Sequence, residues 1–228
     1  MINLYLQYFK HKTESRRKEL DYCTRHNIKN SSFDKVYIFL EKEEDRQEWM
    51  NNPKVIVENF GHRMTFRNFA EYTNTIDTNN DITHVITNLD MFFDNDILKL
   101  NQHNIDNHLI TLTRWNIDVV TKKANFFNVN CSQDTWIWKG VVDLSKLDLG
   151  YYLGTPGCDN AICGEFYEAG FKVINPSLDL KSYHLHQEIK RDYNDNDVVR
   201  KKLYLLYPTN EWDKSLIQYW KDCTNFQA

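Results

Sequence analysis

Short runs of β-branched and aromatic residues alternate with stretches of helical periodicity, and this alternation constrains the fold more than any other feature of the sequence. Strands are expected over 2–9, 34–41, 54–60, 83–90, 107–115 and 135–144. Helices are expected over 14–28, 41–52, 65–76, 94–104 and 158–170, with Thr65 as an N-cap. Such alternation is typical of an α/β fold, so we predict a mainly parallel central sheet flanked by helices.

The part of the chain after 170 is less regular. Residues 171–186 are expected to be extended, and the charged stretch 186–202 is expected to form a mobile segment or a helical arm. A terminal helix is predicted over 212–220. It would pack back on the protein through Trp212, Leu216 and Trp220.

Length and composition suit a domain of ordinary size. The chain has 228 residues, of which 41% are hydrophobic, and this is enough for one substantial core. We predict a single domain over 1–190, followed by a C-terminal helical arm or linker over 191–228 that packs on it.

Charge and hydropathy exclude several classes of protein. The 28 basic and 32 acidic residues are interspersed and give a net charge of -4, so nucleic acid is not an expected partner. No run approaches the roughly 20 apolar residues of a membrane span, and the first residues lack a signal-peptide pattern. Five cysteines without CxxC spacing indicate reduced thiols. We therefore predict a cytoplasmic protein without a membrane span.

Oxygen ligands follow the expected strand 83–90 directly. Asn88 and Asp90 are two residues apart, and Asp94 comes shortly after them. Ligands gather at the carboxyl ends of strands in parallel sheets, and such side chains suit a hard cation such as Mg²⁺ or Mn²⁺. The alternative is that these residues only end the strand and that Asp94 caps the next helix.

A second polar cluster closes the extended stretch 171–186. His184 and His186 form an H-x-H pattern, and imidazole suits Mn²⁺ better than Mg²⁺. Lys190 and Arg191 follow and could close over a diphosphate, or they could form a solvated charged face.

Asp159 lies near the start of the expected helix 158–170, after a glycine-containing turn. It could act as a base toward a hydroxyl acceptor or serve as the N-cap of that helix. The chain contains no GxGxxG, GxxxxGK[ST] or GxSxG pattern. The signatures of dinucleotide oxidoreductases, P-loop proteins and serine hydrolases are therefore missing.

Several segments together resemble a known family. In chain order they are "RMTF", "TNLDMFFD", "LTRW", "SQDTWIW" and "GTPGCDNAICGEFYEAGFKVINPSLDLKSYHLH". They resemble GT-A-type glycosyltransferases and related proteins of bacteria, algae and large DNA viruses, with the closest resemblance to chlorella virus domains that glycosylate the major capsid protein. The resemblance covers 63–191 and implies a GT-A fold.

The resemblance also implies roles for single residues. Asp90 would be the main metal carboxylate, and Asn88 would stand where the first acid of a D-x-D motif usually lies, with Asp94 or a histidine compensating for the lost charge. One of His184 and His186 would complete the metal site. The remaining implied roles are acceptor-facing carboxylate for Asp159, donor contact for Arg63 and Arg114, and sugar or acceptor contact for Gln133, Asp134 and Trp136.

These observations predict a hexosyl-type, Mn²⁺- or Mg²⁺-dependent glycosyltransferase. It would move a sugar from a UDP-sugar to a hydroxyl of a glycan or glycoprotein, with a viral capsid glycan as one candidate acceptor, and would act in the host cytoplasm if the protein is viral. The alternative is a catalytically silent nucleotide- or sugar-binding domain on the same fold, which Asn88 favours. A metal-dependent phosphoesterase would need more His and Asp ligands than the two clusters offer.

Overall fold

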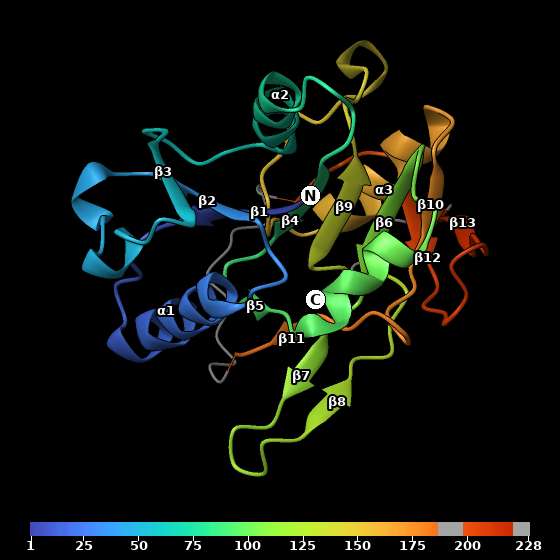
Figure 1. Cartoon of the computed structure of the whole chain (residues 1–228). Coiled ribbons are helices and arrows are strands. Elements are labelled where there is room, and N and C mark those ends of the chain that lie inside the picture. Colours follow the sequence, from blue (N-terminus) through green and yellow to red (C-terminus); the bar gives the residue numbers. More distant parts are fainter. Residues whose placement is uncertain (187–197, 221–228) are drawn as a thin grey trace.

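A central sheet of seven strands organises the protein, in the order β10-β6-β9-β4-β1-β2-β3 (Figure 1). The computed structural model describes residues 1–186 and 198–220. The strands of this sheet are β1 (Ile2–Tyr8), β2 (Lys35–Leu40), β3 (Val55–Asn59), β4 (Thr83–Thr87), β6 (His108–Leu112), β9 (Thr135–Lys139) and β10 (Lys172–Ile174).

The sheet is parallel except for β9. Strand β1 pairs in parallel with β2 and β4, β2 with β3, and β10 with β6, whereas β9 runs antiparallel to both β4 and β6. The predicted α/β fold with a mainly parallel sheet flanked by helices is confirmed. Because β9 is reversed, its first residues lie at the same sheet edge as the carboxyl ends of β4 and β6.

Helices cover both faces of the sheet. The α-helices are α1 (Glu14–Lys29), α2 (Phe66–Ile76) and α3 (Cys158–Glu168), and the 3-10 helices are η1 (Glu43–Asp45), η2 (Glu48–Met50), η3 (Asn95–Gln102) and η4 (Leu144–Lys146). Thr65 caps α2 as predicted, since its side chain accepts a hydrogen bond from the backbone N–H of Asn68. The predicted helix 41–52 is wrong, because only the short turns η1 and η2 form there.

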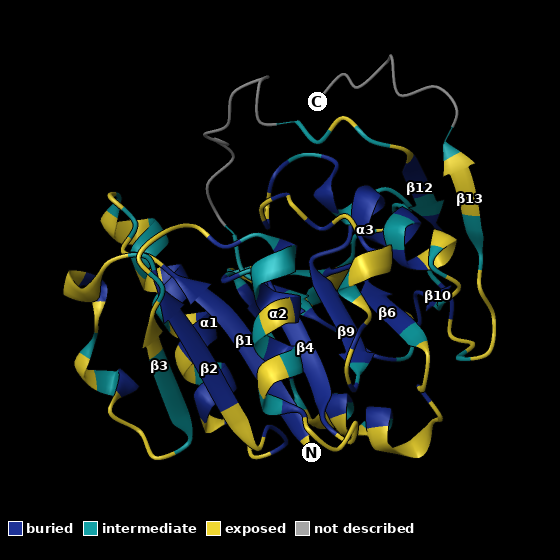
Figure 2. Cartoon of the chain, turned by 90° about the horizontal axis from the view of Figure 1, so that it is seen from above, coloured by how far each residue is buried: buried dark blue, intermediate teal, exposed yellow. Residues whose placement is uncertain are grey.

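Alternate residues of each strand fill two separate cores, as the period of two along a strand requires. Tyr5 and Phe39 face α2 and α3, where Phe69 and Phe166 meet them in one buried cluster. The intervening residues face α1 and η3. They form the second cluster with Leu20, Ile28, Ile97 and Leu100. Figure 2 shows that the central strands are buried along almost their whole length.

A second, four-stranded sheet lies beyond the carboxyl edge of the first, in the order β5-β11-β7-β8. Its strands are β5 (Met91–Phe92), β11 (Tyr183–His184), β7 (Trp115–Ile117) and β8 (Ala124–Phe126). Four aromatic residues lie in register across it, with Tyr183 between Phe92 and Trp115, and Trp115 opposite Phe126. Since side chains alternate between faces, His184 and Asn116 lie on the opposite face.

The C-terminal part packs on α3. Strands β12 (Leu203–Leu206) and β13 (Ile217–Trp220) form an antiparallel pair, so the predicted helix over 212–220 is wrong. Asn160 Nδ2 donates to the carbonyl of Tyr204 at 2.8 Å. A Cβ atom on Gly164 would lie 2.5 Å from the Tyr204 ring, so α3 and β12 approach as closely as only glycine permits. The division at 190 itself stays a prediction.

Two smaller points complete the fold. The predicted helix 94–104 is the 3-10 helix η3, and Asp94 caps it by accepting from the backbone N–H of Asp96 at 2.9 Å. Within the described residues, none of the helices combines the length and the apolar character needed to cross a membrane.

Candidate functional site

Polar side chains from three strands of the large sheet meet at its carboxyl edge. Asn88 follows β4, Arg114 follows β6, and Asp134 precedes the reversed strand β9. Backbone hydrogen bonds fix the three loops together, because Asn88 N donates to Asp134 O and Asp134 N donates to Leu112 O, each at 3.1 Å. The edge therefore gathers side chains that are far apart in the sequence, as expected for an α/β sheet.

Asp90, His184 and His186 form one cluster at this edge. Their ligand atoms all lie within 4.8 Å of one another. Asp90 Oδ2 is 3.1 Å from His184 Nε2 and 3.8 Å from His186 Nδ1. Burial alone would raise the pKa of Asp90, but the contacts with His184 and Arg16 outweigh it and hold the pKa well below the usual value. Burial and the nearby Arg16 lower the pKa of His186, which favours the neutral form of its imidazole.

Asn116 fixes which nitrogen of His184 faces Asp90. The Asn116 side-chain oxygen accepts from Arg114 Nε at 3.1 Å and lies 2.9 Å from His184 Nδ1. Because Arg114 can only donate, this atom must be the acceptor, so Nδ1 of His184 carries the hydrogen. With Nδ1 engaged in this way, Nε2 is the nitrogen that contacts Asp90 and the one whose lone pair a bound cation would use. This is how histidine ligands of metal sites are usually oriented.

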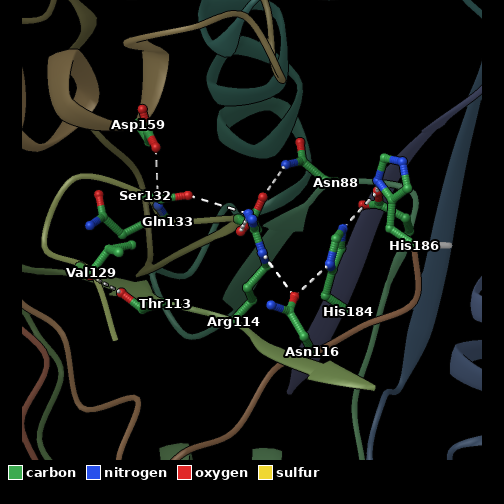
Figure 3. Close-up of polar contacts among 12 residues, drawn as sticks. Asn88, Thr113, Arg114, Asn116, Val129, Ser132, Gln133, Asp159, His184 and His186 are labelled. Carbon is green, nitrogen blue, oxygen red and sulfur yellow. Dashed lines mark hydrogen bonds and ion pairs between the residues drawn. The ribbon is translucent and has the colours of Figure 1, made fainter. Parts of the chain in front are cut away.

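Arg114 continues the network toward the centre of the edge (Figure 3). Its guanidinium forms an ion pair with Asp134 Oδ2 at 2.9 Å. Asn88 Nδ2 donates to the other oxygen of Asp134, also at 2.9 Å. The predicted residues Asn88, Arg114 and Asp134 are thus brought together, and Asn116 connects them to His184.

Asp159 lies at the far end of the same edge. Its carboxylate accepts from the backbone N–H of Gln133 at 3.1 Å, next to Asp134. Gly157, not Asp159, is the N-cap of α3, so the capping role considered for Asp159 is wrong. Burial and the neighbouring Asp134 raise the pKa of Asp159 to about 7, against the opposing effect of the backbone N–H groups. A carboxyl with such a pKa suits proton transfer near neutrality.

The cluster of Asp90, His184 and His186 fits a divalent cation. One carboxylate and two imidazoles are donors that suit Mn²⁺, and the orientation of His184 by Asn116 leaves its lone pair on the correct side. The predicted metal ligands therefore converge in the structure. Asp94 does not join them, because it caps η3 and accepts from Tyr183 Oη at 2.8 Å.

Other predicted residues lie differently. Trp136 is fully buried in the first core, with its ring 4.7 Å from that of Phe66, so the predicted contact with a sugar is wrong. Gln133 is also buried, and its Nε2 donates to Asn130 O at 3.3 Å. Arg63 is exposed and lies against Gly154, whose added Cβ would be 3.9 Å from Nη2. Lys190 and Arg191 fall outside the described residues.

Two residues of the site were missed in the sequence. Asn116 could have been found, because it lies two residues after Arg114 and so faces the same side of a strand. Arg16, which contacts Asp90, is one of several charged residues on α1, and no local pattern distinguishes it.

The comparisons with known proteins show the fold. No protein-family model and no curated protein sequence match the chain. Among solved structures it is similar to S. aureus TarS 1-349 in complex with UDP-GlcNAc, at 10% identity and a TM-score of 0.51, covering 83% of this chain. The chain spans 59% of that structure.

Two further structures have lower scores. The cytidylyltransferase IspD of Francisella tularensis is 16% identical with a TM-score of 0.41, covering 60% of this chain and 72% of its own. The glycosyltransferase GlyE of Streptococcus pneumoniae is 10% identical with a TM-score of 0.42, covering 78% of this chain and 45% of its own.

Proposed function

We propose that the protein is a metal-dependent glycosyltransferase that moves a sugar from a UDP-sugar to a hydroxyl of a glycan or glycoprotein. One observation carries the proposal. The cluster of Asp90, His184 and His186 and the carboxyl of Asp159 lie on one sheet edge and are connected through Asn116, Arg114 and Asp134. The fold likeness to TarS, whose structure contains UDP-GlcNAc, supports the UDP-sugar as donor.

The two ends of the site would have different tasks. Asp90, His184 and His186 would hold Mn²⁺ or Mg²⁺. When bound, the cation would stabilise the negative charge that develops on the leaving diphosphate. Asn88 and Arg63 both lie against Gly154, since a Cβ there would be 3.8 Å from Asn88 Oδ1 and 3.9 Å from Arg63 Nη2. From this position the two side chains would contact the UDP-sugar.

Asp159 would face the acceptor. With a pKa raised to about 7, its carboxylate can accept the proton of the attacking hydroxyl if the reaction inverts the anomeric centre. If the reaction retains the configuration, the same carboxylate would stabilise a cationic sugar. Gln133, whose backbone N–H holds the Asp159 carboxylate, and Asp134, whose charge helps to raise the pKa of Asp159, would support the acceptor side. A capsid glycan as acceptor and a cytoplasmic location stay predictions.

A silent nucleotide- or sugar-binding domain is the second candidate. Asn88 brings no charge to the metal site, and its amide is engaged with Asp134. Arg16 forms an ion pair with the one carboxylate of the cluster. Both observations favour binding without turnover, so the two candidates must be separated by experiment.

The test combines binding with turnover. UDP and several UDP-sugars are titrated calorimetrically with Mn²⁺ and with chelator, and slow hydrolysis of the UDP-sugar is followed without acceptor. If the protein is the proposed enzyme, both binding and hydrolysis of the UDP-sugar should require Mn²⁺. Asp90→Ala should then reduce hydrolysis by at least about 100-fold. Asp81→Ala, at the opposite end of β4, is the control and should keep full activity. Metal-dependent binding without hydrolysis would favour the silent domain, and retained activity in Asp90→Ala would contradict the metal assignment.

A further inference from the structure

A guanidinium already lies on the carboxylate of the proposed metal site. Arg16, in the first turn of α1, donates from Nη2 to Asp90 Oδ2. Its Nη1 donates to Glu19 Oε2 at 2.8 Å and to the carbonyl of Leu185 at 3.1 Å. The side chains of Arg16 and Asp90 are each only 13% exposed, so this ion pair is poorly screened by water.

Arg16 would compete with a bound cation for Asp90 Oδ2, the atom that His184 and His186 also face. Asp90 Oδ2 is 3.1 Å from His184 Nε2 and 3.8 Å from His186 Nδ1. A divalent cation held by these three groups would lie directly beside the guanidinium. Like charges at such a distance repel strongly in a partly buried site. Arg16 and the cation therefore cannot both make their best contact with Asp90.

The remaining contacts of Arg16 allow it to leave Asp90 without leaving the site. Glu19 is one turn further along α1 and is buried, with 6% of its surface exposed. It retains the guanidinium through Nη1 while Nη2 is released. The released N–H groups of Arg16 would then be available to the diphosphate of the UDP-sugar, and guanidinium groups bind phosphates well.

We propose that Arg16 is an internal counter-cation of the metal site. It pairs with Asp90, gives up this contact when a divalent cation binds, and is held nearby by Glu19 for the diphosphate. The inference rests on the metal site of the proposed function. It implies that Arg16 lowers the affinity for the metal alone, and that metal and nucleotide strengthen each other's binding, as linkage requires.

The test measures binding of Mn²⁺ alone, without nucleotide, by calorimetry. Removing the charge in Arg16→Gln should tighten Mn²⁺ binding by about 10-fold, since coupling between sites is typically of this size. Arg16→Lys keeps the charge and should stay close to the unchanged protein. Arg17→Gln removes the neighbouring charge on the same helix and is the matched control, expected to change nothing. Equal or weaker binding to Arg16→Gln, or no Mn²⁺ binding by any of these proteins, would overturn the inference.

A second measurement needs no variant and decides the question if Arg16→Gln does not fold. Nitrogen-15 NMR of the arginine side chains reports whether the Arg16 guanidinium is held rigidly. Titration with diamagnetic Mg²⁺ should change the Arg16 signals toward those of a more mobile group, and unchanged signals at saturation would contradict displacement. If Mn²⁺ binds equally to the unchanged protein and to Arg16→Gln, the inference fails while the metal site of the proposed function stands. If none of these proteins binds Mn²⁺, both fail.

Discussion

Arg114 and His184 donate to the same atom, the side-chain oxygen of Asn116, at 3.1 and 2.9 Å. This shared acceptor joins the two halves of the candidate site. On one side Arg114 pairs with Asp134, and on the other His184 faces Asp90. Asn116, which contacts neither metal nor substrate in the proposed scheme, therefore sets the orientation of the proposed metal ligand His184 and of Arg114.

Asn116→Ala should weaken binding of Mn²⁺ by roughly 10- to 100-fold, as loss of a partner of a histidine ligand usually does. The physical reason is that Nδ1 of His184 loses its acceptor, so the ring is no longer fixed with Nε2 toward Asp90. Calorimetric titration of Mn²⁺ measures the effect. Asn125→Ala is the matched control, since Asn125 lies opposite Asn116 on β8 and is exposed. An equal loss of Mn²⁺ affinity in Asn116→Ala and Asn125→Ala would show that the substitutions disturb the four-stranded sheet and that the His184–Asn116 hydrogen bond is not the cause.

The raised pKa of Asp159 predicts a pH dependence of the reaction. As a base, Asp159 must be ionised, so kcat/KM should increase with pH and level off above about 7. The profile is measured for hydrolysis or transfer between pH 5 and 9 at saturating Mn²⁺. A rate that is flat through this range would contradict the assignment of Asp159 as the base.

The same shift has a consequence for stability. The pKa of Asp159 is higher in the folded protein, at about 7, than in the unfolded chain, at about 3.9. The contribution of Asp159 to the free energy of unfolding is therefore fully present below about pH 4, and it is lost as the pH rises through 7. Asp159→Asn should become more stable relative to the unchanged protein by roughly 2–4 kcal/mol between pH 4 and 8. Urea unfolding at several pH values measures this, and a constant difference would contradict the shift.

A buried histidine near the start of β4, at the end of the strand away from the candidate site, predicts that acid lowers the stability of the fold. His84 is fully buried between Tyr5 Oη, at 2.8 Å, and Asp77 Oδ2, at 3.2 Å. Burial lowers the pKa of His84 to about 4, although Asp77 opposes the shift. The neutral His84 ring therefore makes its full contribution to the free energy of unfolding above about pH 6.5, and this contribution is lost as the pH falls through 4.

The free energy of unfolding should therefore decrease by on the order of 3 kcal/mol between pH 6.5 and 4 because of His84. His84→Gln should remove this part of the pH dependence, at the cost of a lower stability at pH 7. His62→Gln, at an exposed position, is the control and should keep the full dependence. An unchanged pH profile in His84→Gln would refute the role of this histidine.

The sequence predicted the large sheet well because its strands are buried, and burial imposes regular patterns. The same alternation explains the wrong prediction for Trp136. It lies in the middle of the sheet on β9, where an alternate residue must face the core, and only the order of the strands reveals this. The convergence of Asp90 with His184 was accessible because both follow apolar stretches. The contact of Arg16 with Asp90 depends on tertiary packing alone.

The prediction of a helix over 212–220 was wrong for a different reason. Trp212, Leu216 and Trp220 are spaced as on a helix, but β13 pairs with β12 instead, and this pairing places Ile217 and Trp220 against the first core. Trp212 packs elsewhere, stacked on His103 with the ring centroids 4.1 Å apart. Local periodicity cannot detect a partner strand, so tertiary pairing overrode it.

The close approach of α3 and β12 gives the last prediction. A Cβ on Gly164 would lie 2.5 Å from Cδ2 of Tyr204, and the Tyr204 hydroxyl also donates to Glu168 at 2.8 Å. Gly164→Ala should therefore push β12 away from α3 and lower the free energy of unfolding by about 1–3 kcal/mol, although alanine is the better helix former. Chemical denaturation measures the loss.

A double-mutant cycle supplies the control for this contact. If the clash with the Tyr204 ring causes the loss, Gly164→Ala should cost little or even stabilise the helix once Tyr204→Ala has removed the ring. Additive effects of the two substitutions would mean that the ring does not press on Gly164. Coupling of the expected sign would show that the C-terminal strands pack on the domain in solution, which is the arrangement predicted for the residues after 190.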